Sequence, residues 1–247
     1  MNNATGDFWH LLTDSFRRTE LPAIAVTELL VAVLAATALS IPRRSWRYFG
    51  LLATVVHELG HAFAALTSGQ RLSGIRLRLD HSGTTTTYSR SRAATAWSCF
   101  WGYPVPGVVG AALVICGFSG WGPALFSGGV MVLAASLLFI RNLAGFAITT
   151  GAIAGTTALI LVVPDAFAGH TAVVLGLAML VGAVRDLFKL ANVHLRRRDR
   201  LASSDAYLLY RATAVPSVVW IMLFAVLVTG SWLAAWQPIA SILTRAA

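Results

Sequence analysis

Two histidines and a glutamate stand in the sequence HELGH at residues 57–61, within an apolar stretch that extends from residue 51 to 69. In a helix, residues four apart lie on one face about one turn apart, so the imidazoles of His57 and His61 can reach one metal ion. Zinc binds imidazole nitrogen at about 2.0–2.1 Å, and a catalytic zinc takes three protein ligands and leaves a fourth position for water. Glu58 adjoins that position, where it can take a proton from water and later deliver it to a leaving amine.

The surroundings of this motif favour a zinc site over the alternative, a structural pair of histidines. Ionisable side chains near the centre of a lipid-embedded helix are disfavoured by about 2.5–3.5 kcal/mol each for Asp, Lys or Arg. A chance HExxH in a soluble helix has no such cost, because its side chains can face water. We therefore expect His57 and His61 to be zinc ligands and Glu58 to be the general base.

The third ligand is expected among the later aspartates, because an intramembrane acid marks a functional site by default. By the topology given below, Asp165 is extracytoplasmic, and Asp199 in RRRDR fits a solvated ion pair. Asp186 and Asp205 flank a cytoplasmic connection towards which the metal-binding helix runs. We favour Asp186, at the inner end of a spanning helix, over Asp205, whose sequence ASSDAYLL also fits an N-cap or a first-turn acid.

The composition predicts an all-α polytopic membrane protein with a single domain over residues 1–247. Hydrophobic residues make up 57% of the chain and charged residues 12%, against about a quarter charged in soluble domains. About seven apolar stretches approach the roughly 20 residues needed to cross the hydrocarbon core. They are placed at about 22–41, 48–67, 100–118, 122–140, 143–163, 170–187 and 213–236.

Cys99 and Cys116 lie in or beside apolar segments and indicate neither a disulfide framework nor a thiolate metal site.

The basic residues set the expected orientation. The net charge of +9 comes mostly from arginines in short segments between apolar runs, which is the pattern of cytoplasmic loops and not of nucleic-acid binding. The bias places the N-terminus and both long connections, 68–96 and 188–212, in the cytoplasm. Residues 1–21 are expected to lie amphipathically on the membrane surface, and the first apolar run is expected to stay as an anchor.

A short β-hairpin is expected after the metal-binding helix. In GIRLRLDHSGTTTTYS, Ile75, Leu77 and Leu79 alternate with polar residues before a turn at residues 81–83. The edge of such a hairpin could accept an extended peptide as an added strand, which makes Ile75 and Leu77 candidate substrate-binding residues. The alternative is a solvated hairpin that merely joins two helices. Asn142 is a further candidate, for a substrate strand or a developing oxyanion, although such a residue is more often a helix cap.

Several segments together resemble the site-2-protease-like intramembrane zinc metallopeptidases, in particular a compact bacterial branch without PDZ or CBS domains. These segments are HELGHAFAALTSGQRLSGIRL, GYPVPGVVGAAL, RNLAGF, VRDL and SSDAYLLYRATAVPSVVW, within about residues 46–220. The resemblance implies two histidine ligands, a glutamate base and an aspartate ligand from a later helix. The Asn-Pro-Leu-Asp-Gly signature of the better-known members is absent, so Asp186 and Asp205 both stay candidates. The resemblance also implies that the protein lies in a bacterial cytoplasmic membrane.

The expected function is zinc-dependent hydrolysis of peptide bonds in or near transmembrane segments of membrane proteins. Its expected partners are a membrane-protein or peptide substrate and the lipid bilayer. The alternative is a catalytically silent scaffold that keeps the fold, but a scaffold has no need of a general base. A transporter ranks last, because its polar residues would be spread over several helices.

Overall fold

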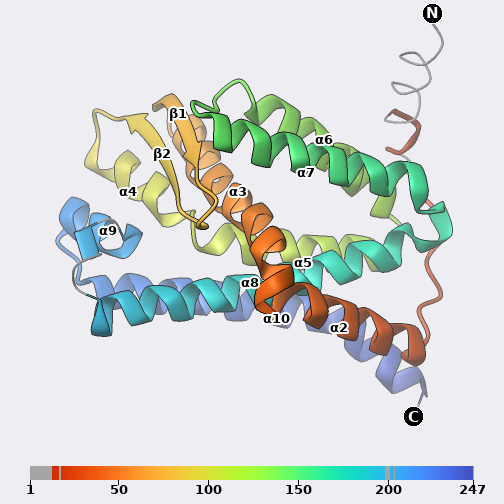
Figure 1. Cartoon of the computed structure of the whole chain (residues 1–247). Helices are drawn as coiled ribbons and strands as arrows, with labels where there is room; N and C mark the ends of the chain where they lie inside the picture. The colour runs from red at the N-terminus through yellow and green to blue at the C-terminus, as the bar shows by residue number, and fades with distance from the viewer. Residues whose placement is uncertain (1–12, 17, 198–200, 203, 247) are drawn as a thin grey trace, which may run out of the picture.

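The computed structural model describes residues 13–16, 18–197, 201–202 and 204–246. Most of these residues are helical, and one two-stranded antiparallel sheet lies among the helices (Figure 1). The expected amphipathic segment 1–21 falls largely outside the described residues. In chain order the elements are α2 (Val26–Ser40), α3 (Arg43–Thr67), β1 (Arg71–Leu77), β2 (Gly83–Tyr88), α4 (Arg92–Phe100), α5 (Pro104–Phe118), α6 (Gly122–Ser136), α7 (Leu143–Val162), α8 (Asp165–Arg196), α9 (Asp205–Thr213) and α10 (Ser217–Ala246).

The number of possible membrane spans is smaller than expected. Within the described residues, four helices are long and apolar enough to cross a membrane, namely α3, α7, α8 and α10. Helices α4 and α5 would add a fifth as a pair bent by 49°. Helices α2 and α6 are apolar but have 15 residues each, short of the roughly 20 that a span requires. The expected seven spans are therefore not confirmed, because hydropathy registers apolar runs but not where helices end or bend.

Helices α5 and α8 pack closely enough for their backbones to touch, and this packing sets how the two helices lie relative to each other. A Cβ atom built on Gly110 would lie 2.8 Å from the carbonyl oxygen of Gly176, and one on Gly117 would lie 2.8 Å from that of Gly169. Small residues at a helix interface allow such an approach where no hydrophobic effect drives association. The start of α5 and the last turns of α8 are thereby held at the same end of the molecule.

The predicted hairpin is confirmed. Strand β1 pairs antiparallel with β2, from Arg71 opposite Tyr88 to Leu77 opposite Gly83. Ile75 and Leu77 are 2% and 1% exposed and belong to a buried cluster shared with residues of α3 and α6. The alternating pattern therefore turns one face of the hairpin onto the helices.

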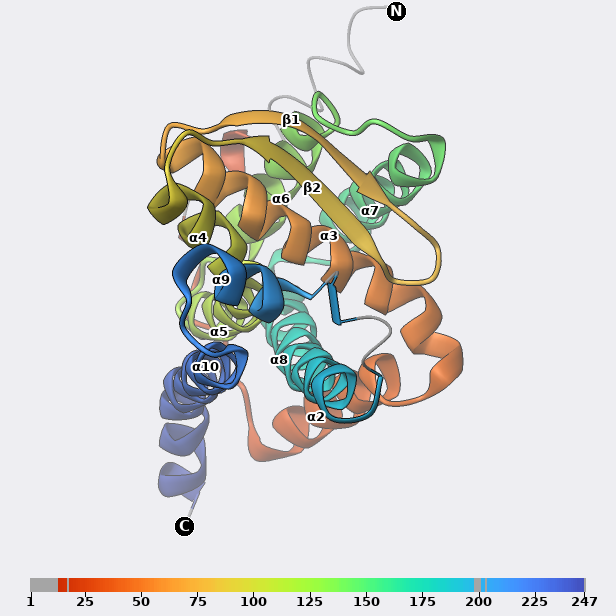
Figure 2. The ribbon, with the colours of Figure 1, turned by 90° about the vertical axis from the view of Figure 1, so that its left-hand side faces the viewer.

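The connection expected over residues 188–212 is shorter than predicted. Helix α8 continues to Arg196 and α9 begins at Asp205. Buried Leu190 on this extension packs in one cluster with Leu209 of α9 and Phe224 of α10. This packing stabilises the extra helical turns of α8 and holds α9 beside α4 and α10 (Figure 2).

Candidate metal centre

His57, His61 and Asp205 bring three donor atoms together. The Nε2 atoms of the two histidines are 3.1 Å apart, and Oδ2 of Asp205 lies 3.3 Å from Nε2 of His57 and 3.2 Å from Nε2 of His61. Ligands at about 2.0–2.1 Å from a tetrahedral zinc are separated by about 3.3 Å. The three atoms therefore fit three corners of a zinc tetrahedron, with the fourth corner left over.

Helix α3 presents both histidines, and α4 sets the ring orientation of one. Nδ1 of His61 donates a hydrogen bond to the carbonyl oxygen of Ser98, 2.7 Å away. Because that carbonyl only accepts, Nδ1 carries the hydrogen, and Nε2 is the ring nitrogen directed at the centre. The ring of His57 meets the ring of Tyr103 edge-on, with centroids 4.8 Å apart, and Tyr103 stacks on Phe224 of α10.

Asp205 reaches the centre from the first turn of α9. The side chain of Ser204 caps this helix by accepting from the amide of Tyr207, and it lies 2.9 Å from Nε2 of His194 at the end of α8. Burial by itself raises the pKa of Asp205, but the two neighbouring imidazoles outweigh it and hold the pKa of this carboxyl below its ordinary value. Asp205 is thus an ionised carboxylate suited to a cation. Its position as a first-turn acid also agrees with the local sequence pattern.

Asp186, the aspartate favoured from the sequence, is not part of this group of donors. It lies in the uninterrupted helix α8, where His57 and Lys189 are among its electrostatic neighbours. The structure therefore brings the alternative candidate, Asp205, to the histidines, because α9 folds back over them and α8 does not.

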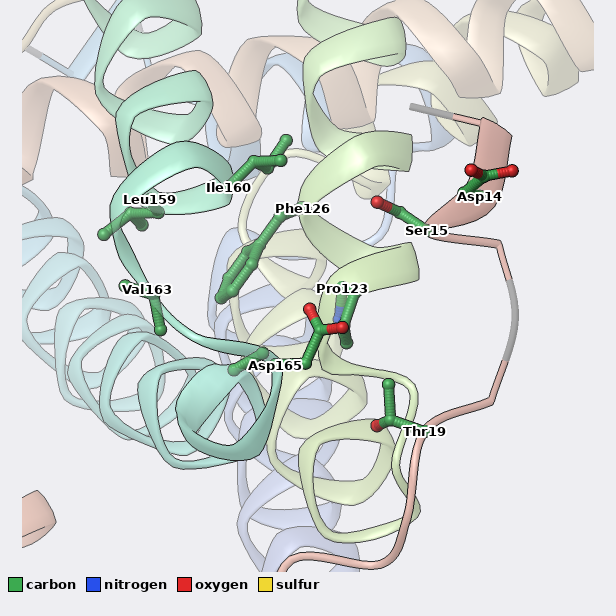
Figure 3. A pocket seen from close by; sticks show the side chains of 10 residues that line it. Asp14, Ser15, Thr19, Pro123, Phe126, Leu159, Ile160, Val163 and Asp165 are labelled. Atoms are coloured by element: carbon green, nitrogen blue, oxygen red, sulfur yellow. The ribbon is translucent and has the colours of Figure 1, made fainter. Parts of the chain in front are cut away.

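The other two aspartates lie elsewhere. Asp165 begins α8, whose 32 residues span about 48 Å at 1.5 Å per residue. It lines a cavity of about 160 Å³ together with Asp14, Pro123 and Phe126 (Figure 3). Asp199 lies outside the described residues.

Three glycines allow close approach at the site: Gly102 to the donors, Gly83 to Glu58, and Gly60 to the backbone of Trp101. A Cβ atom on Gly102 would overlap Nε2 of His61 and lie 2.8 Å from Nε2 of His57, and one on Gly60 would overlap the carbonyl oxygen of Trp101. A Cβ atom on Gly83 would lie 2.6 Å from Cδ of Glu58. Sequence analysis missed Gly102. The signal that could have identified it is its place in WGYPVP, just before two prolines.

We expect Gly102→Ala to weaken zinc binding by roughly 10–100-fold, the range typical of changes just outside the ligands. The added methyl group would push the two imidazoles away from their shared position. Gly128→Ala is the matched control, since nothing lies within 4 Å of a Cβ at that position. Competition titration with a zinc indicator measures both variants, and equal affinities would show that Gly102 has no such role.

Glu58 lies beside the donors and is held by the hairpin. It is 4% exposed, and the Thr85 hydroxyl donates to its Oε2 at 2.6 Å, with the Glu58 carbonyl oxygen 3.2 Å from the same hydroxyl. Thr85 was not singled out from the sequence. The alternation in TTTT, in which Thr84 and Thr86 are exposed and Thr85 is half-buried, is the signal that could have identified it.

Most of the chain matches a known protein family. A model of the Peptidase M50B-like family matches residues 30–235, which include HELGH, the hairpin and Asp205. The chain belongs to the Peptidase M50B-like family. The resemblance to site-2-protease-like metallopeptidases is thereby confirmed, and with its long apolar helices the chain is an integral membrane protein. No match was found among curated proteins or among solved structures.

The residues expected to bind substrate in this M50B-like chain have other partners. The amide of Ile75 donates to the carbonyl oxygen of Phe139 at 2.8 Å, and the carbonyl oxygen of Ile75 accepts from the amide of Arg141 at 2.9 Å. The side chain of Asn142 makes two hydrogen bonds with the backbone of Leu77. The outer edge of β1 is therefore occupied by residues 139–142, and the side chains of Ile75 and Leu77 are buried.

Proposed function

We propose that the chain is a zinc-dependent intramembrane endopeptidase that hydrolyses peptide bonds in or near transmembrane segments of membrane proteins. The observation that carries this proposal is the convergence of two imidazoles and one carboxylate at tetrahedral separations, next to a buried glutamate. Zinc is the metal that this donor set suits, since catalytic zinc sites commonly combine two histidines with one carboxylate.

When bound, zinc would polarise the scissile carbonyl and lower the pKa of a coordinated water to about 7. The chain's own residues supply the remaining chemistry. Glu58 accepts a proton at its carboxylate and returns it to the leaving amine. The Thr85 hydroxyl holds Oε2 of Glu58, which fixes the carboxylate in orientation without adding a negative charge.

The hairpin offers a different edge to a substrate from the one expected. Because the backbone of Ile75 bonds away from β2, its partner Thr85 directs its own amide and carbonyl to the free edge of β2. By alternation Gly83 and Thr87 do the same. This edge faces the side of the hairpin on which α9 lies (Figure 2). A substrate segment added to it would run extended past Glu58.

We expect Thr87→Pro to reduce cleavage of a membrane peptide by about 10-fold with zinc content unchanged. Proline removes an amide on the free edge but leaves the pairing with β1 intact. Thr87→Ala is the control, because it removes the side chain and keeps the amide. Equal rates for the two variants would exclude strand addition at this edge.

The positive-inside bias gives the proposed orientation. The hairpin region and the start of α4 hold five arginines, Arg71, Arg76, Arg78, Arg90 and Arg92. We therefore place this end of the molecule, with the metal centre, on the cytoplasmic side of a bacterial cytoplasmic membrane. Arg18 and Thr19 bond to Ser119 and Gly120 at the far end of α5, so the expected cytoplasmic N-terminus does not follow from this placement.

Metal removal tests the proposed function. The purified protein is expected to contain one zinc per chain and to cleave members of a panel of fluorescently labelled single-span peptides reconstituted with it in liposomes. Treatment with 1,10-phenanthroline should abolish cleavage, and added zinc should restore it. A protein that binds no zinc, or that cleaves equally well after the metal has been removed, would overturn the proposal.

A further inference from the structure

A second cavity, of about 500 Å³, lies where the end of α3, the start of β1, the end of β2 and the start of α4 meet. Its lining includes Ser68, Gln70, Arg71, Tyr88, Arg90 and Ser91. None of the three metal donors lines it, and neither does Glu58. It is a separate polar site on the same side of the molecule as the hairpin.

The charge of this cavity favours an anion. Arg71 and Arg90 are both exposed side chains of its wall, and no acidic residue lines it. Among the described residues every close ion pair involves a histidine, so neither arginine is neutralised by a carboxylate. The first turn of α4, which follows Ser91, adds the positive end of a helix dipole.

Gln70 adds a second requirement on the ligand. This side chain is only 6% exposed. Its Nε2 donates to the carbonyl oxygen of Ala94 at 2.6 Å and to the hydroxyl of Ser68 at 2.9 Å. These bonds fix the amide, and its Oε1 is buried without a hydrogen-bond partner. A buried acceptor in a cavity wall calls for a donor, which an inorganic anion with no hydrogens does not supply.

The apolar surface beside the cavity points to the kind of molecule. Phe63 and Leu66 on the last turns of α3 are 71% and 49% exposed, and Trp97, one turn beyond Ala94 on α4, is 47% exposed. Tyr88, at the cavity itself, is also exposed. Aromatic residues at the limit of an apolar surface are typical of the membrane–water interface. The cavity therefore lies where headgroups meet acyl chains.

We propose that this cavity binds the headgroup of an anionic glycerophospholipid, with the phosphodiester between Arg71 and Arg90 and a headgroup hydroxyl donating to Oε1 of Gln70. Phosphatidylglycerol has both groups. Its acyl chains would lie along Phe63, Leu66 and Trp97. The bound lipid would join the hairpin to the junction of α3 and α4, and this role is independent of the proposed peptidase activity.

Native mass spectrometry of the purified protein with added lipids tests the proposal. Wild type is expected to retain dioleoylphosphatidylglycerol at roughly 10-fold lower concentration than dioleoylphosphatidylcholine. A tenfold difference in affinity corresponds to about 1.4 kcal/mol of binding free energy. Arg71→Gln/Arg90→Gln should lose this preference. Arg76→Gln/Arg78→Gln, with the same change of charge on the same hairpin but outside the cavity, should keep it.

Two further arms separate the ligand classes. Dioleoylphosphatidylmethanol has the same charge as phosphatidylglycerol but no headgroup hydroxyl, so wild type should prefer phosphatidylglycerol and Gln70→Met should not. sn-Glycerol-1-phosphate should compete poorly, because it lacks the acyl chains. Competition by this soluble ester as strong as by the lipid, or equal phosphatidylglycerol binding by the two double variants, would overturn the proposal.

Discussion

Glu58→Gln is expected to abolish peptide cleavage while zinc stays bound. Glutamine has nearly the shape of glutamate, and its amide oxygen can still accept a hydrogen bond from the hydroxyl of Thr85. The side chain should therefore keep its buried position beside the hairpin. The amide cannot accept the proton that the reaction must move. General acid–base catalysis by one group contributes roughly 10²- to 10⁴-fold, and we expect a loss of about 10³-fold or more. Zinc content and cleavage of a labelled single-span peptide are measured on the same sample.

Glu20→Gln is the control for this substitution, because Glu20 is exposed and lies outside the candidate site. It should have the zinc content and the activity of wild type. Glu58→Gln also distinguishes the peptidase from the catalytically silent scaffold. If cells that carry Glu58→Gln in place of wild type show no defect, the base is not needed and the scaffold explains the protein better.

The local parts of the candidate site could be predicted from the sequence. The spacing of His57 and His61 is a property of one helix, and the placement of Glu58 beside them follows from the same turn. The hairpin likewise follows from alternation and a turn over a few neighbouring residues. Each of these inferences needs only the geometry of a single element.

Other parts of the site depend on how distant elements pack. Asp205, and not Asp186, lies beside the histidines because α8 continues to Arg196 and α9 returns towards them, an arrangement that the packing of Leu209 and Phe224 stabilises. The edge of β1 was expected to be free because residues 139–142, which occupy it, lie far along the chain. The count of seven spans is not confirmed, since hydropathy does not show that α2 and α6 end after 15 residues each.

The second large effect is expected at Asp205. Asp205→Ala should weaken zinc binding by more than about 100-fold. Changes to residues that do not bind the metal directly typically weaken it by about 10- to 100-fold. The substitution removes the only one of the three grouped donors that has a negative charge, and it leaves two imidazoles about 3.1 Å apart with no anion beside them. Cleavage should be lost in proportion to the zinc. Competition titration with a zinc indicator gives the affinity, and elemental analysis gives the stoichiometry.

Asp186→Ala is the matched variant, since it removes the aspartate favoured by the sequence from the neighbourhood of the same histidine. Its zinc affinity should fall by no more than about 10–100-fold, the range typical of changes to residues that do not bind the metal directly. Asp205→Asn refines the comparison, because it keeps the size of the side chain and a neutral oxygen but removes the charge. An intermediate affinity for Asp205→Asn would show that charge and contact both contribute. If Asp186→Ala loses the metal and Asp205→Ala retains it, the assignment reverses: Asp186 would complete the site, and Asp205 would be only the first-turn acid of α9.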